Sequence, residues 1–187
     1  FAEPVWQPLD DAWPTAPDAA HSLAFVRHVV LLCDVGPEAD VVAKALSDAA
    51  MAPVEHRCIA LFSTGDDPAE SYRSLSLQCF EQLRELASDA AAGRTLVQCV
   101  VPDADDRQTL RGLTGLLRSV AMEQSRIMTQ LIGVDADIDA QALVARLRTL
   151  AVRSQVTLAR DHGGRIEALD WRRVAPDAAA ESIYKDA

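Results

Sequence analysis

The chain lacks several residue patterns on which catalysis commonly depends. Its 187 residues contain no asparagine, and the only lysines are Lys44 and Lys185. Tyr72 is followed four residues later by Ser76, and no fourth residue follows Tyr184, so a catalytic Tyr-x-x-x-Lys/Asn pair is missing. The G-x-S-x-G turn that presents a nucleophilic serine does not occur either. Both catalytic arrangements are therefore excluded for this chain.

Metal-binding cysteine pairs and basic clusters are also missing. The four cysteines, at positions 33, 58, 79 and 99, form no C-x-x-C pair, and each lies in an apolar run, which is typical of buried, reduced thiols in a cytosolic protein. The formal net charge is -10 and the pI about 4.8, whereas nucleic acids and anionic membranes select for clustered Lys and Arg. No apolar run approaches the length of a membrane span, and no signal peptide opens the chain. We therefore expect a cytoplasmic protein that binds neither nucleic acid nor membrane.

The composition predicts one globular domain. Hydrophobic residues make up 49% and charged residues 25%, so a chain of this length is able to bury a core without disulfides or metals. The first residue is Phe rather than Met, as in a piece of a longer polypeptide, although processing or tag removal leaves the same trace.

Strand and helix patterns alternate along the chain. An edge strand is expected at 5–9, and continuous apolar runs typical of strands covered on both faces occur at 29–33, 57–62, 95–101 and 130–134. Apolar residues at helical spacing follow them at 41–49, 68–90, 103–120 and 139–150. Strands at 156–160 and 165–171, joined through Gly163 and Gly164, predict a terminal hairpin. The order predicts a Rossmann-like three-layer α/β fold with a mostly parallel sheet, right-handed crossovers and an antiparallel terminal hairpin.

The first turn from strand to helix has no glycine loop. The segment DVGPEAD, from Asp34 to Asp40, stands where a dinucleotide-binding chain carries G-x-G-x-x-G. An anion would there meet Glu38 and Asp40 instead of bare N–H groups at a helix N-terminus. We therefore predict no cofactor-binding residue and no catalytic residue, and interpret the chain as a non-catalytic partner domain.

Acidic residues follow the strands, at the edge where open α/β sheets bind ligands. They are Asp34, Asp66, Asp67, Asp103, Asp135 and Asp137. Such carboxylates are able to hold Mg²⁺, so an independent Mg-dependent α/β enzyme is the alternative function. We favour helix caps and no metal site, because no Lys or Ser/Thr partner recurs nearby. The four histidines, at 21, 28, 56 and 162, show no ligand spacing and indicate structural or surface roles.

Two glycines, Gly112 and Gly115, lie within the predicted helix that starts near residue 103. A helical glycine costs roughly 0.5–1 kcal/mol relative to alanine. We expect both to let this helix approach the sheet or a neighbouring helix closely.

Residues 113–123 read LTGLLRSVAME and residues 130–135 read QLIGVD. Together they resemble the "GLLRS…E" helix and "QLI.VD" strand of the structural subdomain of modular polyketide synthase ketoreductases, especially of the trans-acyltransferase type. Gln124-Ser125 departs from the Asn-Pro pair common at that point. The strand around Trp6, the hairpin at 159–171 and the segment IYKDA at 183–187 are similar to parts of the same subdomain, so the resemblance covers nearly the whole chain.

The resemblance implies one half of a ketoreductase. In that family a truncated Rossmann-like half without cofactor braces a second half, which binds NADPH, carries the catalytic Tyr, Ser, Lys and Asn, and reduces a β-ketoacyl group on a carrier protein. None of those four residues maps onto this chain. We expect a single structural subdomain with an edge strand and Pro-rich lead-in at 1–23, a core at 24–154, a hairpin at 155–174 and a linker toward the catalytic subdomain at 175–187. A pseudo-ketoreductase that has lost its catalytic half is a variant.

The partners implied are the catalytic subdomain of the same polypeptide and neighbouring synthase domains. Both ends of the chain carry large apolar side chains in short, polar-flanked segments, which the central helices do not cover because their apolar stripes face the sheet. The residues expected at the subdomain interface are Val5, Trp6, Leu9 and Trp171.

Overall fold

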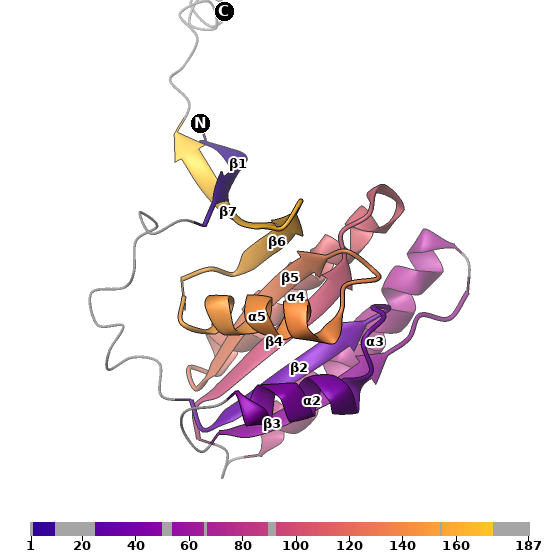
Figure 1. Ribbon diagram of the computed structural model, residues 1–187. Coiled ribbons are helices and arrows are strands. Elements are labelled where there is room, and N and C mark those ends of the chain that lie inside the picture. The colour runs from indigo at the N-terminus through magenta and orange to yellow at the C-terminus, as the bar shows by residue number, and fades with distance from the viewer. Residues whose placement is uncertain are drawn as a thin grey trace, which may run out of the picture.

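The computed structural model describes residues 2–9, 25–49, 54–65, 67–89, 93–153 and 155–173. They form a three-layer α/β structure around one seven-stranded sheet (Figure 1). The strands are β1 (Ala2–Pro8), β2 (Arg27–Cys33), β3 (Glu55–Leu61), β4 (Thr95–Pro102), β5 (Ile127–Val134), β6 (Leu158–His162) and β7 (Arg165–Arg173). The helices are α2 (Ala39–Asp48), α3 (Pro68–Ser88), α4 (Leu113–Glu123), α5 (Ala140–Ala151) and the 3-10 helix η1 (Asp105–Gly112). The predicted Pro-rich lead-in beyond Leu9 and the predicted linker at 175–187 lie outside the described residues.

The sheet has the strand order β1-β7-β6-β5-β4-β2-β3. Strands β3, β2, β4, β5 and β6 run parallel, whereas β7 pairs antiparallel with β6 and β1 pairs antiparallel with β7. Strand β4 is buried along its whole length, as expected for an apolar strand covered on both faces. The predicted fold class, a truncated Rossmann-like α/β fold with an antiparallel terminal hairpin, is confirmed.

Each face of the sheet carries two α-helices, and η1 packs on the same side as α3 and α4. Helices α2 and α5 cover the side chains of Val30, Leu32 and Ile132, and helices α3 and α4 cover those of Leu31 and Leu131. Neighbouring residues of a strand thus serve opposite cores, as the alternation of side chains along a strand requires. No helix among the described residues has the length and apolarity to cross a membrane.

The crossovers do not all have one hand. The β2–α2–β3 and β5–α5–β6 crossovers move toward opposite edges of the sheet with their helices on the same face, so their hands are opposite (Figure 1). The expectation of right-handed crossovers throughout is therefore wrong. Placing α5 beside α2 covers Val100, Ile132 and Val134, whereas a helix on the other face would leave these side chains without a covering layer.

The segment after β4 also differs from its prediction. A 3-10 helix, η1, precedes α4, where the sequence predicts one helix from residue 103. Arg107 and Arg111 of η1 reach back to Asp34 and Asp103 at the strand ends, with N–O distances of 3.0 and 2.5 Å. A Cβ on Gly112 would lie 3.1 Å from the hydroxyl of Tyr72 in α3, so the predicted close approach is confirmed for this glycine. These contacts hold η1 against the strand ends in the tighter 3-10 geometry.

The terminal hairpin matches its prediction. Gly163 and Gly164 have φ angles of 58° and 80°, and two left-handed residues in a two-residue turn form the type I′ turn that fits strand twist. Strand β1 then pairs along the outer side of β7, with Trp6 opposite Leu169. The two ends of the described chain thus form one antiparallel ribbon (Figure 1).

Candidate functional site

The turn after β2 is closed by an ion pair. Asp34 adopts a left-handed φ of 51°, and its carboxylate, with the side chain 15% exposed, accepts hydrogen bonds from Ser63 N at 2.8 Å and Arg107 Nη1 at 3.0 Å. Gly36 N donates to Ala136 O at 2.8 Å, and a Cβ at Gly36 would lie 3.1 Å from that oxygen. Asp34 therefore ties the turn after β2 to the segment that follows β3 and to η1.

This turn lies where a doubly wound sheet binds its ligand. Strand β3 lies on one side of β2 and β4 lies on the other. The direction in which successive strands are added to the sheet therefore reverses between β2 and β4. Asp34 and Arg107 stand at that point, and helix α2 begins beyond it with Glu38 as N-cap and Asp40 in its first turn. The negative charges of Glu38 and Asp40 make this helix N-terminus unsuited to a phosphate group.

The strand-end acids play different roles. Asp67 accepts from Ala69 N at 3.4 Å and caps α3, as predicted. The cap predictions for Asp34 and Asp103 are wrong, because Arg107 and Arg111 reach these carboxylates instead. The cap predictions for Asp135 and Asp137 are also wrong, because both are exposed and Asp139 is the N-cap of α5. Asp66 lies outside the described residues.

No group of three or more acids is close enough to hold a metal in the part of the chain that the structure describes. The alternative of a Mg-dependent enzyme is accordingly not favoured. The ion pairs of Asp34 and Asp103 occupy two carboxylates that such a site would need.

Helix α5 offers a matched test of capping. Asp139 is its N-cap and accepts from Ala142 N at 2.8 Å, whereas Asp135 is exposed in the preceding turn. Asp139→Ala should lower the free energy of unfolding by about 1 kcal/mol, and Asp135→Ala should change it by less than about 0.5 kcal/mol. Urea denaturation of both variants checks the prediction, and equal losses would show that Asp139 is no more a cap than Asp135.

Four polar side chains form a ladder across strands β3, β2, β4 and β5. His56 of β3 lies next to His28 of β2 (Nδ1–Nδ1 3.2 Å), His28 next to Gln98 of β4 (Nε2–Oε1 2.7 Å), and Gln98 next to Gln130 of β5 (Nε2–Oε1 2.7 Å). We call these four residues the polar ladder. His28, Gln98 and Gln130 are all at most 2% exposed. The expected structural role of His28 is thereby confirmed; His162 is exposed and His21 lies outside the described residues.

The ladder ends on the last turn of α5. Gln98 Nε2 donates to Leu147 O at 3.0 Å, and Gln130 Nε2 donates to Leu150 O and Arg153 O, both at 3.0 Å. Leu150 O and Arg153 O also accept from the backbone N–H groups of Arg153 and Val156, so Gln130 is a second donor to both carbonyls. Because carbonyl oxygens only accept, they also fix which end of each glutamine is the amide nitrogen.

The glutamine orientations set the protons of both histidines. Gln98 Oε1 must accept from His28 Nε2–H, so Nδ1 of neutral His28 carries a lone pair and accepts from His56 Nδ1–H. The proton that would charge His28 at Nδ1 would therefore point at the Nδ1–H group of His56. Burial lowers the pKa of His28 to about 4 and also lowers the pKa of His56.

The four predicted interface residues lie on both sides of the β1–β7 ribbon. The Trp6 ring is half-buried and packs against the α3–α4 core, with the guanidinium carbons of Arg160 and Arg111 at 4.4 and 5.3 Å from its centroid. Leu9 packs against the α2–α5 core, and Val5 is half-buried. Trp171 is 62% exposed. Trp6 thus packs against its own chain, whereas the side chain of Trp171 is exposed.

Sequence reasoning missed the arginines and the ladder. Arg107 contacts Asp34, and Arg111 and Arg160 contact Trp6, all far away in the sequence, so no local pattern marks these arginines. The glutamines had a signal, because Gln98 and Gln130 interrupt strand runs that are otherwise apolar. A polar residue inside a buried strand needs a partner, and their partners prove to be each other and α5.

Comparison with known proteins finds two polyketide synthases among the relatives of this chain. No family model matches the chain. The polyketide synthases PksL and PksN of Bacillus subtilis (strain 168) are 26% and 27% identical to it over 165 and 176 residues. The chain is homologous to these two synthases. The alignments cover 88% and 92% of the chain but 3% of either synthase.

A solved structure shares the fold. The crystal structure of a ketoreductase domain from the bacillaene assembly line aligns with 94% of this chain and 38% of its own, with a TM-score of 0.71 and 21% sequence identity. The polyketide synthase homologue described here therefore has the fold of a part of a ketoreductase domain.

Proposed function

We propose that this chain is the structural subdomain of a polyketide synthase ketoreductase. In this role it performs no chemistry and braces a catalytic subdomain that binds NADPH and reduces β-ketoacyl groups. The observation that carries the proposal is the switch point between β2 and β4, where Asp34 and Arg107 pair across the position a cofactor would need. A chain that has also lost its catalytic half, a pseudo-ketoreductase, would have the same structure and no turnover in the complete protein.

The extent of the structural match supports a half-domain. The chain aligns with 38% of the solved ketoreductase, so more than half of that domain has no counterpart here. A catalytic subdomain in the same polypeptide would face this chain at an effective concentration around millimolar, and a modest apolar interface would then suffice.

Helix α4 provides a surface for that interface. A Cβ on Gly115 would meet no atom within 4 Å among the described residues, so the predicted close approach of this glycine has no partner in the structure. Met122, two turns further on the same helix, is 83% exposed. A glycine that costs stability in a helix and an exposed methionine are both explained if another helix packs there.

The β1–β7 ribbon continues this surface. Trp171 lies two residues after Leu169, so it points to the same side of β7, the side of the α3–α4 core. Figure 1 shows the ribbon projecting beyond the helices. We therefore assign Val5, Trp6, Leu9 and Trp171 to the end of the chain that meets the catalytic subdomain, with Trp171 in direct contact.

Gly115 gives a test that separates the isolated chain from the complete ketoreductase. Gly115→Ala should raise the free energy of unfolding of the isolated chain by about 0.5–1 kcal/mol, because the new Cβ meets open space. Gly112→Ala should not, because its Cβ would press on the Tyr72 hydroxyl at 3.1 Å. Denaturant unfolding of the two variants measures the difference.

The larger substitution Gly115→Leu tests the interface. In the complete ketoreductase it should lower turnover of a β-ketoacyl thioester about tenfold or more, since overpacking an interface costs about 1–3 kcal/mol. Ser47→Leu, at an exposed position of α2 on the opposite face, is the matched control and should leave turnover unchanged. Equal turnover in the two variants would contradict the assignment of α4 to the interface.

A further inference from the structure

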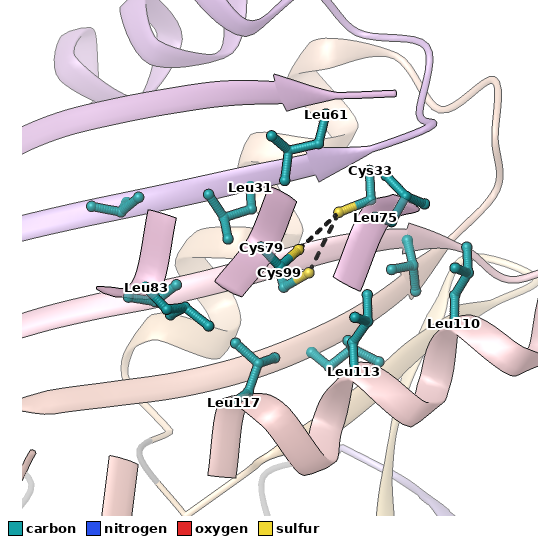
Figure 2. Close-up of a cluster of buried hydrophobic side chains, with 14 of the residues drawn as sticks. Leu31, Cys33, Leu61, Leu75, Cys79, Leu83, Cys99, Leu110, Leu113 and Leu117 are labelled. Carbon is teal, nitrogen blue, oxygen red and sulfur yellow. Dashed lines mark hydrogen bonds between the residues drawn. The ribbon is translucent and has the colours of Figure 1, made fainter. Parts of the chain in front are cut away.

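Three cysteine sulfurs meet in the α3–α4 core. They come from Cys33 of β2, Cys79 of α3 and Cys99 of β4, and Figure 2 shows them pointing toward one another. The distance from Cys33 Sγ is 3.8 Å to Cys79 Sγ and 3.6 Å to Cys99 Sγ, and all three sulfurs lie within 4.8 Å of one another. Each of the three residues is at most 1% exposed. The sequence spacing of these cysteines gave no sign that they meet.

The potential ligands are three cysteine sulfurs, which are soft donors. In the part of the chain that the structure describes, these cysteines are the only group of three potential ligands so close together. Sulfur donors without oxygen or nitrogen ligands favour thiophilic elements over Mg²⁺, Ca²⁺ or Mn²⁺. One atom bonded to all three sulfurs at about 2.3 Å, the length of a zinc–thiolate bond, would hold them roughly 3.5–4 Å apart. The observed spacing therefore needs little adjustment.

The apolar surroundings of the sulfurs favour the element whose complex with three thiolates has no net charge. The sulfurs lie among leucines, including Leu31, Leu75 and Leu83 (Figure 2). Zn²⁺ with three thiolates carries one negative charge and Cu⁺ with three carries two, and an uncompensated charge is expensive in an apolar core. Trivalent arsenic with three thiolates is neutral.

We propose that Cys33, Cys79 and Cys99 form a binding site for one trivalent arsenic atom, supplied as arsenite. Three As–S bonds form and three As–O bonds break, and each thiol proton leaves with one hydroxide of arsenous acid as water. Nothing is oxidised or reduced. The bound atom joins β2, α3 and β4, so it stabilises the fold, and entry requires α3 to open locally. This site is independent of the proposed role in a ketoreductase.

The test is native mass spectrometry of the 187-residue chain, reduced with a phosphine and incubated with sodium arsenite. The expected product is one adduct per folded chain whose mass equals arsenic less three protons, with a higher melting temperature. Cys99→Val and Cys79→Val, which keep the volume and apolarity of the core, should each abolish the three-bonded adduct and the thermal shift. Cys58→Val, which alters the cysteine outside the cluster, should retain both.

Three results would overturn the proposal. They are no adduct after prolonged incubation, an adduct of unchanged mass in Cys99→Val or Cys79→Val, and loss of the adduct in Cys58→Val. Circular dichroism of each variant establishes that it is folded, and the two cluster variants provide independent readings if one fails. Stoichiometric binding of Zn²⁺ in place of arsenic would contradict the charge argument.

Discussion

Acidification from pH 7.5 to 4 should lower the free energy of unfolding by about 3 kcal/mol through His28 alone. Burial lowers the pKa of His28 to about 4, against 6.5 in the unfolded chain. Between these values the unfolded state binds the proton and the folded state does not, so stability is full above pH 6.5 and falls as the pH approaches 4. His56 adds to the loss in the same direction, because its pKa is also lowered by burial.

The contribution of His28 is separated from that of carboxylates by a variant. His28→Gln keeps a donor for Gln98 Oε1 and removes the titrating ring. Urea denaturation at a series of pH values should show the parent losing about 3 kcal/mol more than His28→Gln between pH 7.5 and 4. Parallel pH profiles of parent and variant would show that the polar ladder does not hold His28 neutral.

The two ribbon tryptophans should differ sharply in the isolated chain. Trp6 is half-buried on the α3–α4 core and makes cation–π contacts with two arginines, so Trp6→Ala should cost about 2–3 kcal/mol. Trp171 is 62% exposed, so Trp171→Ala should change the free energy of unfolding by about 0.5 kcal/mol or less. Denaturant unfolding of both variants of the isolated chain gives these values directly.

In the complete ketoreductase, Trp6→Ala and Trp171→Ala should both be destabilising. If Trp171 packs on the catalytic subdomain, Trp171→Ala lowers the melting temperature and the turnover of the complete protein, as Trp6→Ala does, while NADPH still binds. Melting curves and reduction of a β-ketoacyl thioester measure both effects. A complete protein in which Trp171→Ala melts and turns over like the parent would contradict the contact assigned to Trp171.

The order of strands and helices could be predicted from the sequence because the spacing of apolar residues differs between strands and helices. The apolar run at Val29–Cys33 and the stripe of α3 are local patterns, and the Gly163-Gly164 pair specifies its turn without help from the rest of the chain. The confirmed fold class rests on such patterns.

The predictions that were wrong concern contacts that the local sequence pattern does not specify. Asp34 and Asp103 are ordinary cap candidates until arginines 73 and 8 residues further along fold back onto them. The reversed hand of the last crossover depends on which face of the sheet still lacks cover, and the cysteine cluster depends on three elements meeting. Long-range packing of this kind has no periodic signature in a single sequence.

Calorimetric titration with NADPH determines whether the isolated chain binds the cofactor, with a complete ketoreductase titrated in parallel as the positive control. We expect no saturable heat from the isolated chain, because the Asp34–Arg107 pair and the acids at the start of α2 stand where the pyrophosphate would bind. Saturable binding of one NADPH per chain would contradict this expectation.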